Sequence, residues 1–220
     1  MNETPCSLKL HLTLGRLILA SASPRRKELL AAAGFDFQVM PVSIDEGQGT
    51  GEAAEKFVCR IAAEKARAAM AWIPPPRRSP VLGADTVVVL EGRTLGKPAS
   101  TEEARRMLRL LSGKEHRVLT GVCLLLAMED HAGSAAIMRE DIRLASTAVR
   151  FARLSEEEIE EYVATGEPFD KAGAYAIQGR ASKFVEWIQG CYFNVVGLPI
   201  ALVSQMLKDL DRFLEQRGDR

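Results

Sequence analysis

The chain has 220 residues, of which 47% are hydrophobic and 26% are charged, and 29 basic side chains balance 29 acidic ones. This composition is typical of a globular protein with a substantial core and argues against disordered and fibrous classes. A neutral net charge provides no global positive field for nucleic acid, and the chain lacks an aromatic-rich basic segment. A nucleic-acid-binding module is therefore disfavoured.

The cysteines and the apolar segments indicate the cellular compartment of the protein. The chain holds four scattered cysteines: Cys6, Cys59, Cys123 and Cys191. With no C-x-x-C pair among them, we expect reduced thiols and neither a disulfide framework nor a zinc site. No apolar stretch approaches the ~20 residues that cross a bilayer, and residues 1–15 lack the apolar region of a secretory signal. We expect a cytoplasmic protein without membrane contact, comprising an N-terminal extension (1–15), one α/β domain (16–214) and a tail (215–220).

An apolar strand at 17–20 runs into serines, a proline and two arginines. Because the residue before a proline favours extended geometry, Ser23 suits a helix N-cap and Pro24 suits the first helical position. The free amides of this helix start would face a multiply charged anion. Side chains that would add donors for phosphate oxygens are Ser21, Arg25 and Arg26. The alternative is an ordinary capped helix with solvated arginines.

Hydrophobic periodicity and turn residues predict alternating strands and helices, and hence an α/β fold. In chain order we expect a strand at 17–20, a helix at 24–33, a strand at 37–41, an amphipathic helix at 52–72, an exposed proline-rich loop at 74–80 and a strand at 81–90. There follow a capped helix at 100–111, strands at 117–127 and 141–152 joined by a polar loop, a second capped helix at 155–164, a glycine-punctuated segment at 166–179, a strand at 184–188 with a hairpin turn at 189–190, and a helix at 199–214.

Carboxylates occur within an apolar strand and in the loop after the strand expected at 37–41. Asp85 interrupts the apolar strand 81–90, where a buried carboxylate needs a metal ion, a lysine or the backbone amides of a turn as partner. From its position alone, a structural role in a turn is the better interpretation. Asp45 and Glu46 offer oxygen ligands that suit Mg²⁺ or Mn²⁺, although a solvated acidic loop is the simpler interpretation.

Lysines at three further positions would complete an anion pocket if they converge with the two arginines. They are Lys65, Lys97 and Lys171. Each alone is typical of a solvated helix or loop. A triphosphate needs several cations, together with a metal ion, to offset its charge.

Five motifs in unbroken order resemble the Maf family of nucleoside triphosphate pyrophosphatases over residues 17–207. They are SASPRR at 21–26, GADT at 83–86, GKP at 96–98, KAGAY with IQG at 171–179, and VGLP at 196–199. Several independent motifs are far more specific than a single glycine pattern.

The resemblance implies a two-lobed, mixed-sheet α/β fold similar to inosine triphosphate pyrophosphatases, with the nucleotide in a cleft between the lobes. It implies hydrolysis between the α- and β-phosphates, with Asp85 as the catalytic residue and with Glu46 and Asp85 at the site of a divalent metal cation, Mg or Mn. Asp85 as base, as metal ligand or as both remains open. The substrate-binding residues that follow from the match and from the anion pocket are Ser21, Arg25, Arg26, Lys65, Thr86, Lys97 and Gln178. The same resemblance suggests a homodimer.

Three positions separate the subtypes of this family. The family type that hydrolyses 7-methyl-GTP usually carries an aromatic residue, a glutamine and a glutamate where this chain has Arg25, Thr86 and Gln178. The chain therefore resembles the dTTP/UTP type, with modified pyrimidine nucleotides as further candidate substrates. The alternatives are the 7-methyl-GTP type and a non-catalytic, nucleotide-sensing regulator of septum formation.

Overall fold

The computed structural model describes residues 15–74, 79–129 and 135–217. Within these residues, one seven-stranded mixed sheet has the order β2-β1-β3-β5-β6-β7, and β4 pairs with β3. The pairs β1–β2 and β1–β3 are parallel, and the remaining pairs are antiparallel. The strands are β1 (Leu17–Leu19), β2 (Phe37–Val39), β3 (Val81–Leu90), β4 (Arg93–Leu95), β5 (Glu115–Glu129), β6 (Ala135–Phe151) and β7 (Val185–Gln189). The predicted mixed-sheet α/β fold is confirmed.

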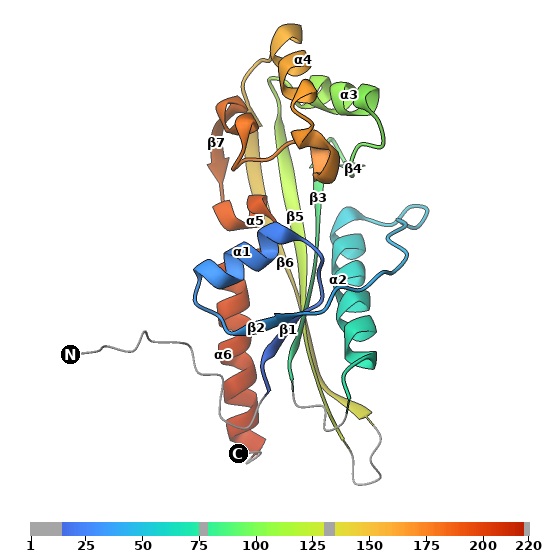
Figure 1. Cartoon of the computed structure of the whole chain (residues 1–220), viewed down its shortest axis with the longest axis vertical. Coiled ribbons are helices and arrows are strands. Elements are labelled where there is room, and N and C mark those ends of the chain that lie inside the picture. Colours follow the sequence, from blue (N-terminus) through green and yellow to red (C-terminus); the bar gives the residue numbers. More distant parts are fainter. Residues whose placement is uncertain (1–14, 75–78, 130–134, 218–220) are drawn as a thin grey trace, which may run out of the picture.

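Helices cover both faces of this sheet, and Figure 1 shows α2 on one side with α1 and α6 on the other. The α-helices are α1 (Pro24–Ala32), α2 (Ala54–Ala71), α3 (Thr101–Leu111), α4 (Glu156–Ala164), α5 (Tyr192–Val196) and α6 (Ile200–Arg217). Short 3₁₀ turns are η1 (Glu167–Asp170), η2 (Ala172–Ala174) and η3 (Arg180–Phe184). Side chains alternate along a strand, so Val81 packs in the α2 cluster while Leu82 packs with α1 and α6. The two apolar faces make β3 a central, buried strand.

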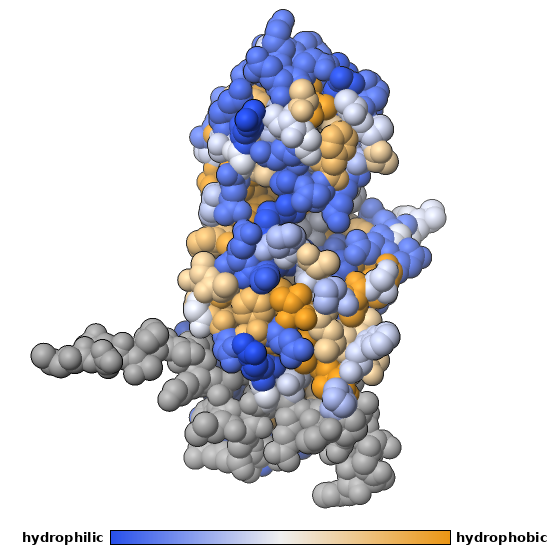
Figure 2. Space-filling view, viewed as in Figure 1, coloured by the Kyte–Doolittle hydropathy of each residue, from blue (hydrophilic) through white to orange (hydrophobic). Residues whose placement is uncertain are grey.

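The end of the molecule that carries α3 and α4 has a polar surface. Figure 2 shows mostly hydrophilic residues around α3 and α4. Arg105 pairs with Glu160 at 2.7 Å and Arg109 with Glu156 at 2.8 Å, which links the two helices at the surface. Such exposed pairs contribute about 0–1 kcal/mol each. The apolar faces beneath them therefore supply most of the packing.

The predicted helix starts are largely confirmed. Ser155 and Glu158 form the predicted capping box. Ser100 accepts from the N–H of Glu103, but the Glu103 carboxylate reaches the N–H of residue 99 instead of that of Ser100. Ser23 occupies the N-cap position of α1 with no side-chain cap bond, and its own N–H donates to Ser21 Oγ at 3.2 Å.

One predicted turn is wrong, and two strands are longer than expected. After Gly190 the chain enters α5 instead of a second hairpin strand, because Thr147 on β6 holds the backbone of Cys191 by two hydrogen bonds. Thr147 Oγ1 accepts from the Cys191 N–H and donates to the Cys191 carbonyl, both at 3.1 Å. The strands expected at 117–127 and 141–152 extend to the full bounds of β5 and β6, since their pairing with each other continues over 15 matched positions.

Several expectations fall partly or wholly outside the described residues. These are the extension up to residue 14, Cys6, residues 75–78 of the proline-rich loop, 130–134 of the polar loop, and the last three residues. The cysteines that the structure describes, Cys59, Cys123 and Cys191, are free thiols. No helix in the described part of the chain is long and apolar enough to span a bilayer.

Two glycines let α2 approach the sheet closely. A Cβ added at Gly83 on β3 would lie 2.1 Å from the Ala62 carbonyl oxygen, and one at Gly121 on β5 would lie 2.3 Å from the Val58 carbonyl oxygen. Gly121 pairs with Asp85, so both glycines flank Asp85 on the surface under α2. The close approach brings Lys65 of α2 over Asp85.

Gly83→Ala is expected to destabilise the protein by about 3 kcal/mol, since the added methyl group meets helix backbone that can move only with the whole of α2. Urea unfolding followed by circular dichroism measures this loss. Gly96→Ala is the matched control, because a Cβ at Gly96 would meet nothing within 4 Å. Equal unfolding midpoints for the two variants would contradict the close-packing explanation.

Candidate active site

The neighbours of β3 change along its length and leave part of one edge open. β1 pairs with Val81 and Leu82, and β4 pairs with Val88 to Leu90. Between them, residues 83–87 have no strand on this side within the described part of the chain, while β5 covers their other side. A cavity of about 710 Å³ lies at this edge, within the size range of ligand sites. An edge where sheet neighbours change is a common place for such sites.

Ten of the candidate site residues line this one cavity. They are Ser21, Arg25, Arg26, Glu46, Lys65, Asp85, Thr86, Lys97, Lys171 and Gln178. Asp45 does not line it, because its Oδ1 accepts from the Gly47 N–H at 2.9 Å and closes a turn in its own loop. The expected convergence of lysines and arginines therefore exists in the folded chain.

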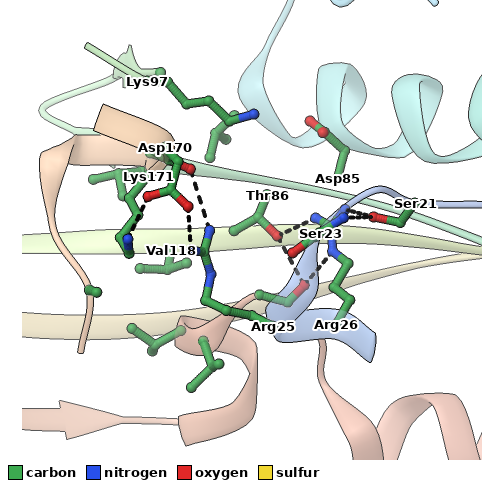
Figure 3. Close-up of a pocket in the computed structure, with 18 of the residues that line it drawn as sticks. Ser21, Ser23, Arg25, Arg26, Asp85, Thr86, Lys97, Val118, Asp170 and Lys171 are labelled. Atoms are coloured by element: carbon green, nitrogen blue, oxygen red, sulfur yellow. Dashed lines mark hydrogen bonds and ion pairs between the residues drawn. The ribbon is translucent and has the colours of Figure 1, made fainter. Parts of the chain in front are cut away.

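Arg26 is buried, and its guanidinium fills the open edge of β3. It donates to the Ala84 carbonyl at 2.8 Å, the Gly197 carbonyl at 2.9 Å and Thr86 Oγ1 at 3.1 Å. A further donor reaches Ser21 Oγ at 3.2 Å (Figure 3). Burial lowers the pKa of Arg26, and the charge of Asp85 opposes that effect. Arg26 thus replaces the strand that β3 lacks and ties the end of β1 to the turn after α5.

Thr86 belongs to the same network. Its hydroxyl contacts Thr120 Oγ1 at 2.9 Å and the Gly197 carbonyl at 3.3 Å, besides accepting from Arg26. Because neighbouring side chains on a strand face opposite sides, Thr86 points toward Gly197 while Asp85 points toward α2. Gly197 has φ +128°, a backbone conformation that favours glycine, so its carbonyl is fixed where Arg26 and Thr86 meet it.

A lysine, and not a turn, compensates Asp85. Lys65 Nζ lies 2.9 Å from Asp85 Oδ1 and 2.7 Å from Glu46 Oε1. Lys65 is 7% exposed and Asp85 9% exposed. Burial alone would raise the pKa of Glu46, but the hydrogen bond and charge of Lys65 outweigh it and lower that pKa below its ordinary value. The interpretation of Asp85 as a carboxylate that ties a turn is therefore wrong.

The two carboxylates are suited to a hard divalent cation. Glu46 and Asp85 already converge on one positive group, which is the arrangement that a metal ion requires of its oxygen ligands. No group of three or more acidic, histidine or cysteine side chains forms a closed metal cage in the described residues. Mg²⁺ commonly uses one or two carboxylates and completes its shell with water and substrate phosphate. The donor set fits such an open site.

Arg25 points away from Arg26, toward the opposite wall of the cavity (Figure 3). Its Nη1 lies 3.0 Å from Asp170 Oδ2, and Lys171 Nζ contacts the other oxygen of Asp170 at 2.5 Å. Burial opposes ionisation of Asp170, yet the hydrogen bonds from Lys171 and Arg25 outweigh it and lower its pKa. Asp170 is a site residue that sequence reasoning missed, and its position next to Lys171 was the available signal.

Lys97 and Gln178 complete the cavity. The N–H of Gly173 donates to the carbonyl of Gly96 at 3.0 Å, which ties the segment before Lys97 to η2. Figure 3 shows the Lys97 side chain reaching across the cavity on the side where Asp85 lies. Gln178 is exposed and lines the cavity from the segment between η2 and η3. A carboxylate pair, several cations and an amide therefore surround one polar space.

Comparisons with known proteins agree on one family. The family model described as "Maf-like protein" matches residues 16–210. The chain is 50% identical over 193 residues to a protein named dTTP/UTP pyrophosphatase from Anaeromyxobacter sp. (strain Fw109-5), covering 88% of each chain. It is 47% identical over 201 residues to a protein of the same name from Koribacter versatilis (strain Ellin345), covering 91% of this chain and 97% of the relative.

Among solved structures, that of the Staphylococcus aureus Ham1 protein is 14% identical and covers 94% of this chain and 100% of that one, with a TM-score of 0.45. That likeness is too distant to bear on the site. The family model and the two relatives span nearly all of the described residues. The chain belongs to the Maf family.

Proposed function

We propose that the protein is a metal-dependent nucleoside triphosphate pyrophosphatase that hydrolyses dTTP and UTP to the monophosphate and pyrophosphate. The observation that carries this proposal is the convergence of Asp85, Glu46 and Lys65 with Arg25 and Lys97 in one cavity. The names of the relatives support the choice of dTTP and UTP.

Charge complementarity supports a triphosphate as the ligand. Lys97 and Lys171 supply positive charge around the cavity, and residues 21–26, at the start of α1, line it. Donors fixed before the substrate arrives stabilise developing phosphoryl charge without reorganisation. The chain's own cations would therefore position the phosphates and stabilise charge on the leaving pyrophosphate.

Asp85 would act as the general base. Its carboxylate is held by Lys65 on one oxygen, so the other can accept a proton from a water aligned with the α-phosphorus. A Mg²⁺ or Mn²⁺ ion held by Glu46 and Asp85 would neutralise phosphate charge and polarise the phosphoryl group. Lys65 keeps the two carboxylates at one point in the free protein.

A pyrophosphate-release assay tests this function. The protein is incubated with dTTP or UTP in Mg²⁺ or Mn²⁺, and the same mixture with excess EDTA is the control. We expect release that depends on the metal. Nucleotide binding without release would instead favour the non-catalytic, nucleotide-sensing alternative.

Base recognition would fall to Gln178 and Arg25, since the Thr86 hydroxyl is engaged by protein groups. A glutamine amide both donates and accepts, and can pair with the carbonyls and N3–H of thymine or uracil. Gln178→Glu removes the donor and sets a negative charge against a carbonyl. We expect kcat/KM for dTTP to fall about tenfold or more.

The control for this change is Gln189→Glu, an exposed site outside the cavity with the same change of charge. Adding Arg25→Trp to Gln178→Glu should shift preference toward 7-methyl-GTP, because indole stacks on a cationic methylated purine. An unchanged ratio of dTTP to 7-methyl-GTP turnover would refute this mode of base recognition.

A further inference from the structure

A hydrogen-bonded pair lies behind the segment that carries Gln178. Tyr162 of α4 is 2% exposed, and its hydroxyl donates to Glu167 Oε1 at 2.8 Å. The same hydroxyl accepts from the N–H of Ala176 at 3.2 Å. The other oxygen of Glu167, Oε2, accepts from the N–H of Arg180 at 3.1 Å. One tyrosine and one glutamate thereby bind both ends of the pentapeptide 176–180.

Gln178 is the central residue of that pentapeptide. Its neighbour Ile177 is buried while Gln178 is exposed to the cavity. A further bond, from the N–H of Gly179 to the carbonyl of Ala176 at 3.0 Å, closes the segment as a turn. A backbone fixed two residues before and two residues after an exposed amide limits the orientations of that amide.

The glycine of this segment is explained by the same contact. A Cβ at Gly179 would lie 2.2 Å from Glu167 Oε1, 2.4 Å from its Cδ and 2.5 Å from Oε2. All three nearest atoms belong to the Glu167 carboxylate. A larger residue at position 179 would therefore displace the Glu167 carboxylate from its present place.

Glu167 also holds a cation of the cavity. Its backbone carbonyl accepts from Lys171 Nζ at 2.9 Å. Burial and the hydrogen bond to Glu167 raise the pKa of Tyr162, so its hydroxyl keeps the proton that it donates. Within η1 and the segment that follows it, one residue thus orients both an amide and an ammonium group that line the cavity.

We propose that Glu167, together with Tyr162, is a positioning residue for base recognition: the pair fixes the turn 176–180 so that the Gln178 amide meets the base of a pyrimidine nucleotide. This inference rests on the proposed function, because it takes Gln178 as the base-reading residue. Glu167 and Tyr162 would act through the turn and would not touch the substrate.

Tyr162→Phe tests the hydroxyl without disturbing the ring, which packs edge-on against Phe184 at 5.4 Å. We expect KM for dTTP to rise roughly fivefold with kcat within about twofold of wild type. The ratio of kcat/KM for dTTP over dATP should fall by a similar factor. Tyr192→Phe and Glu161→Gln, both at exposed positions away from the cavity, are the matched controls.

A double-mutant cycle tests the contact between Glu167 and Gly179. Gly179→Ala alone should raise KM for dTTP about tenfold, because the methyl group displaces the carboxylate. Glu167→Ala should also raise it, and adding Gly179→Ala to Glu167→Ala should cost nothing more. Glu167→Gln should be milder than Glu167→Ala, since its amide oxygen still accepts one bond.

Three outcomes would overturn the inference: unchanged KM and base preference, equal losses for dTTP and dATP with a lowered melting temperature, or the same cost of Gly179→Ala in both backgrounds. The affinity of each variant for dTMP, measured by calorimetry, distinguishes failure of this inference from failure of the proposed function. Wild type that binds dTMP without hydrolysing dTTP would refute the proposed function, and variant affinities for dTMP would still test positioning. Wild type that neither binds dTMP nor hydrolyses dTTP would refute both.

Discussion

Asp85→Asn is expected to lower kcat for pyrophosphate release from dTTP by about 10²–10⁴-fold while leaving the fold intact. The amide keeps the shape of the side chain but cannot take a proton at neutral pH and is a poor metal ligand. Lys65 keeps Glu46 as a partner at 2.7 Å, so its buried ammonium is not left without a negative charge. The loss of stability should therefore be about 1 kcal/mol, below the usual cost of breaking a buried pair.

Steady-state kinetics and thermal unfolding of the same preparation check this expectation. Asp36→Asn is the matched control, since Asp36 pairs with Arg16 at the exposed surface and does not line the cavity. A folded Asp85→Asn protein that turns dTTP over within tenfold of wild type would remove Asp85 from the reaction.

Arg26→Ala should have the largest effect on stability, about 3–5 kcal/mol, with activity lost as well. The change removes the Arg26 donors from the carbonyl oxygens of Ala84 and Gly197, leaves Gly197 only the weaker contact from the Thr86 hydroxyl at 3.3 Å, and empties the edge of β3. Arg26→Lys should recover little, because one ammonium group cannot serve four separated acceptors. Urea unfolding and activity of the folded fraction measure both effects.

Arg25→Ala, on the neighbouring residue, is the variant to compare with Arg26→Ala. The Arg25 side chain is 27% exposed and, within the residues that the structure describes, bonds only to Asp170. We expect its loss to raise KM for dTTP by about tenfold with little change in unfolding midpoint. Two variants that behave alike would mean that the arginines do not divide structural and substrate-binding roles in this way.

Local signals predicted much of this fold. The Ser-Pro pair marked the start of α1, and the Ser155 capping box marked that of α4. The apolar run of β3 and the long amphipathic face of α2 were equally visible, because strand and helix periods act over a few residues. The chain's position in a family followed from motifs that are contiguous in sequence.

Contacts between residues far apart in the sequence could not be predicted from it. Arg26 donates to the carbonyl of Gly197, which is 171 positions away, and Arg25 donates to Asp170, which is 145 positions away. The hairpin expected after β7 failed because Thr147 on another strand holds Cys191. The cavity itself exists because β1 ends at Leu19 and leaves β3 open, which depends on sheet pairing and not on the residues of either strand alone.

The most direct test of the central claim is the identity of the products formed from dTTP in ¹⁸O-labelled water. With Mg²⁺ or Mn²⁺ present, we expect dTMP and pyrophosphate in equal amounts, with the label in dTMP because water attacks the α-phosphorus. Formation of dTDP and inorganic phosphate, or no metal-dependent cleavage of dTTP by the folded protein, would contradict it.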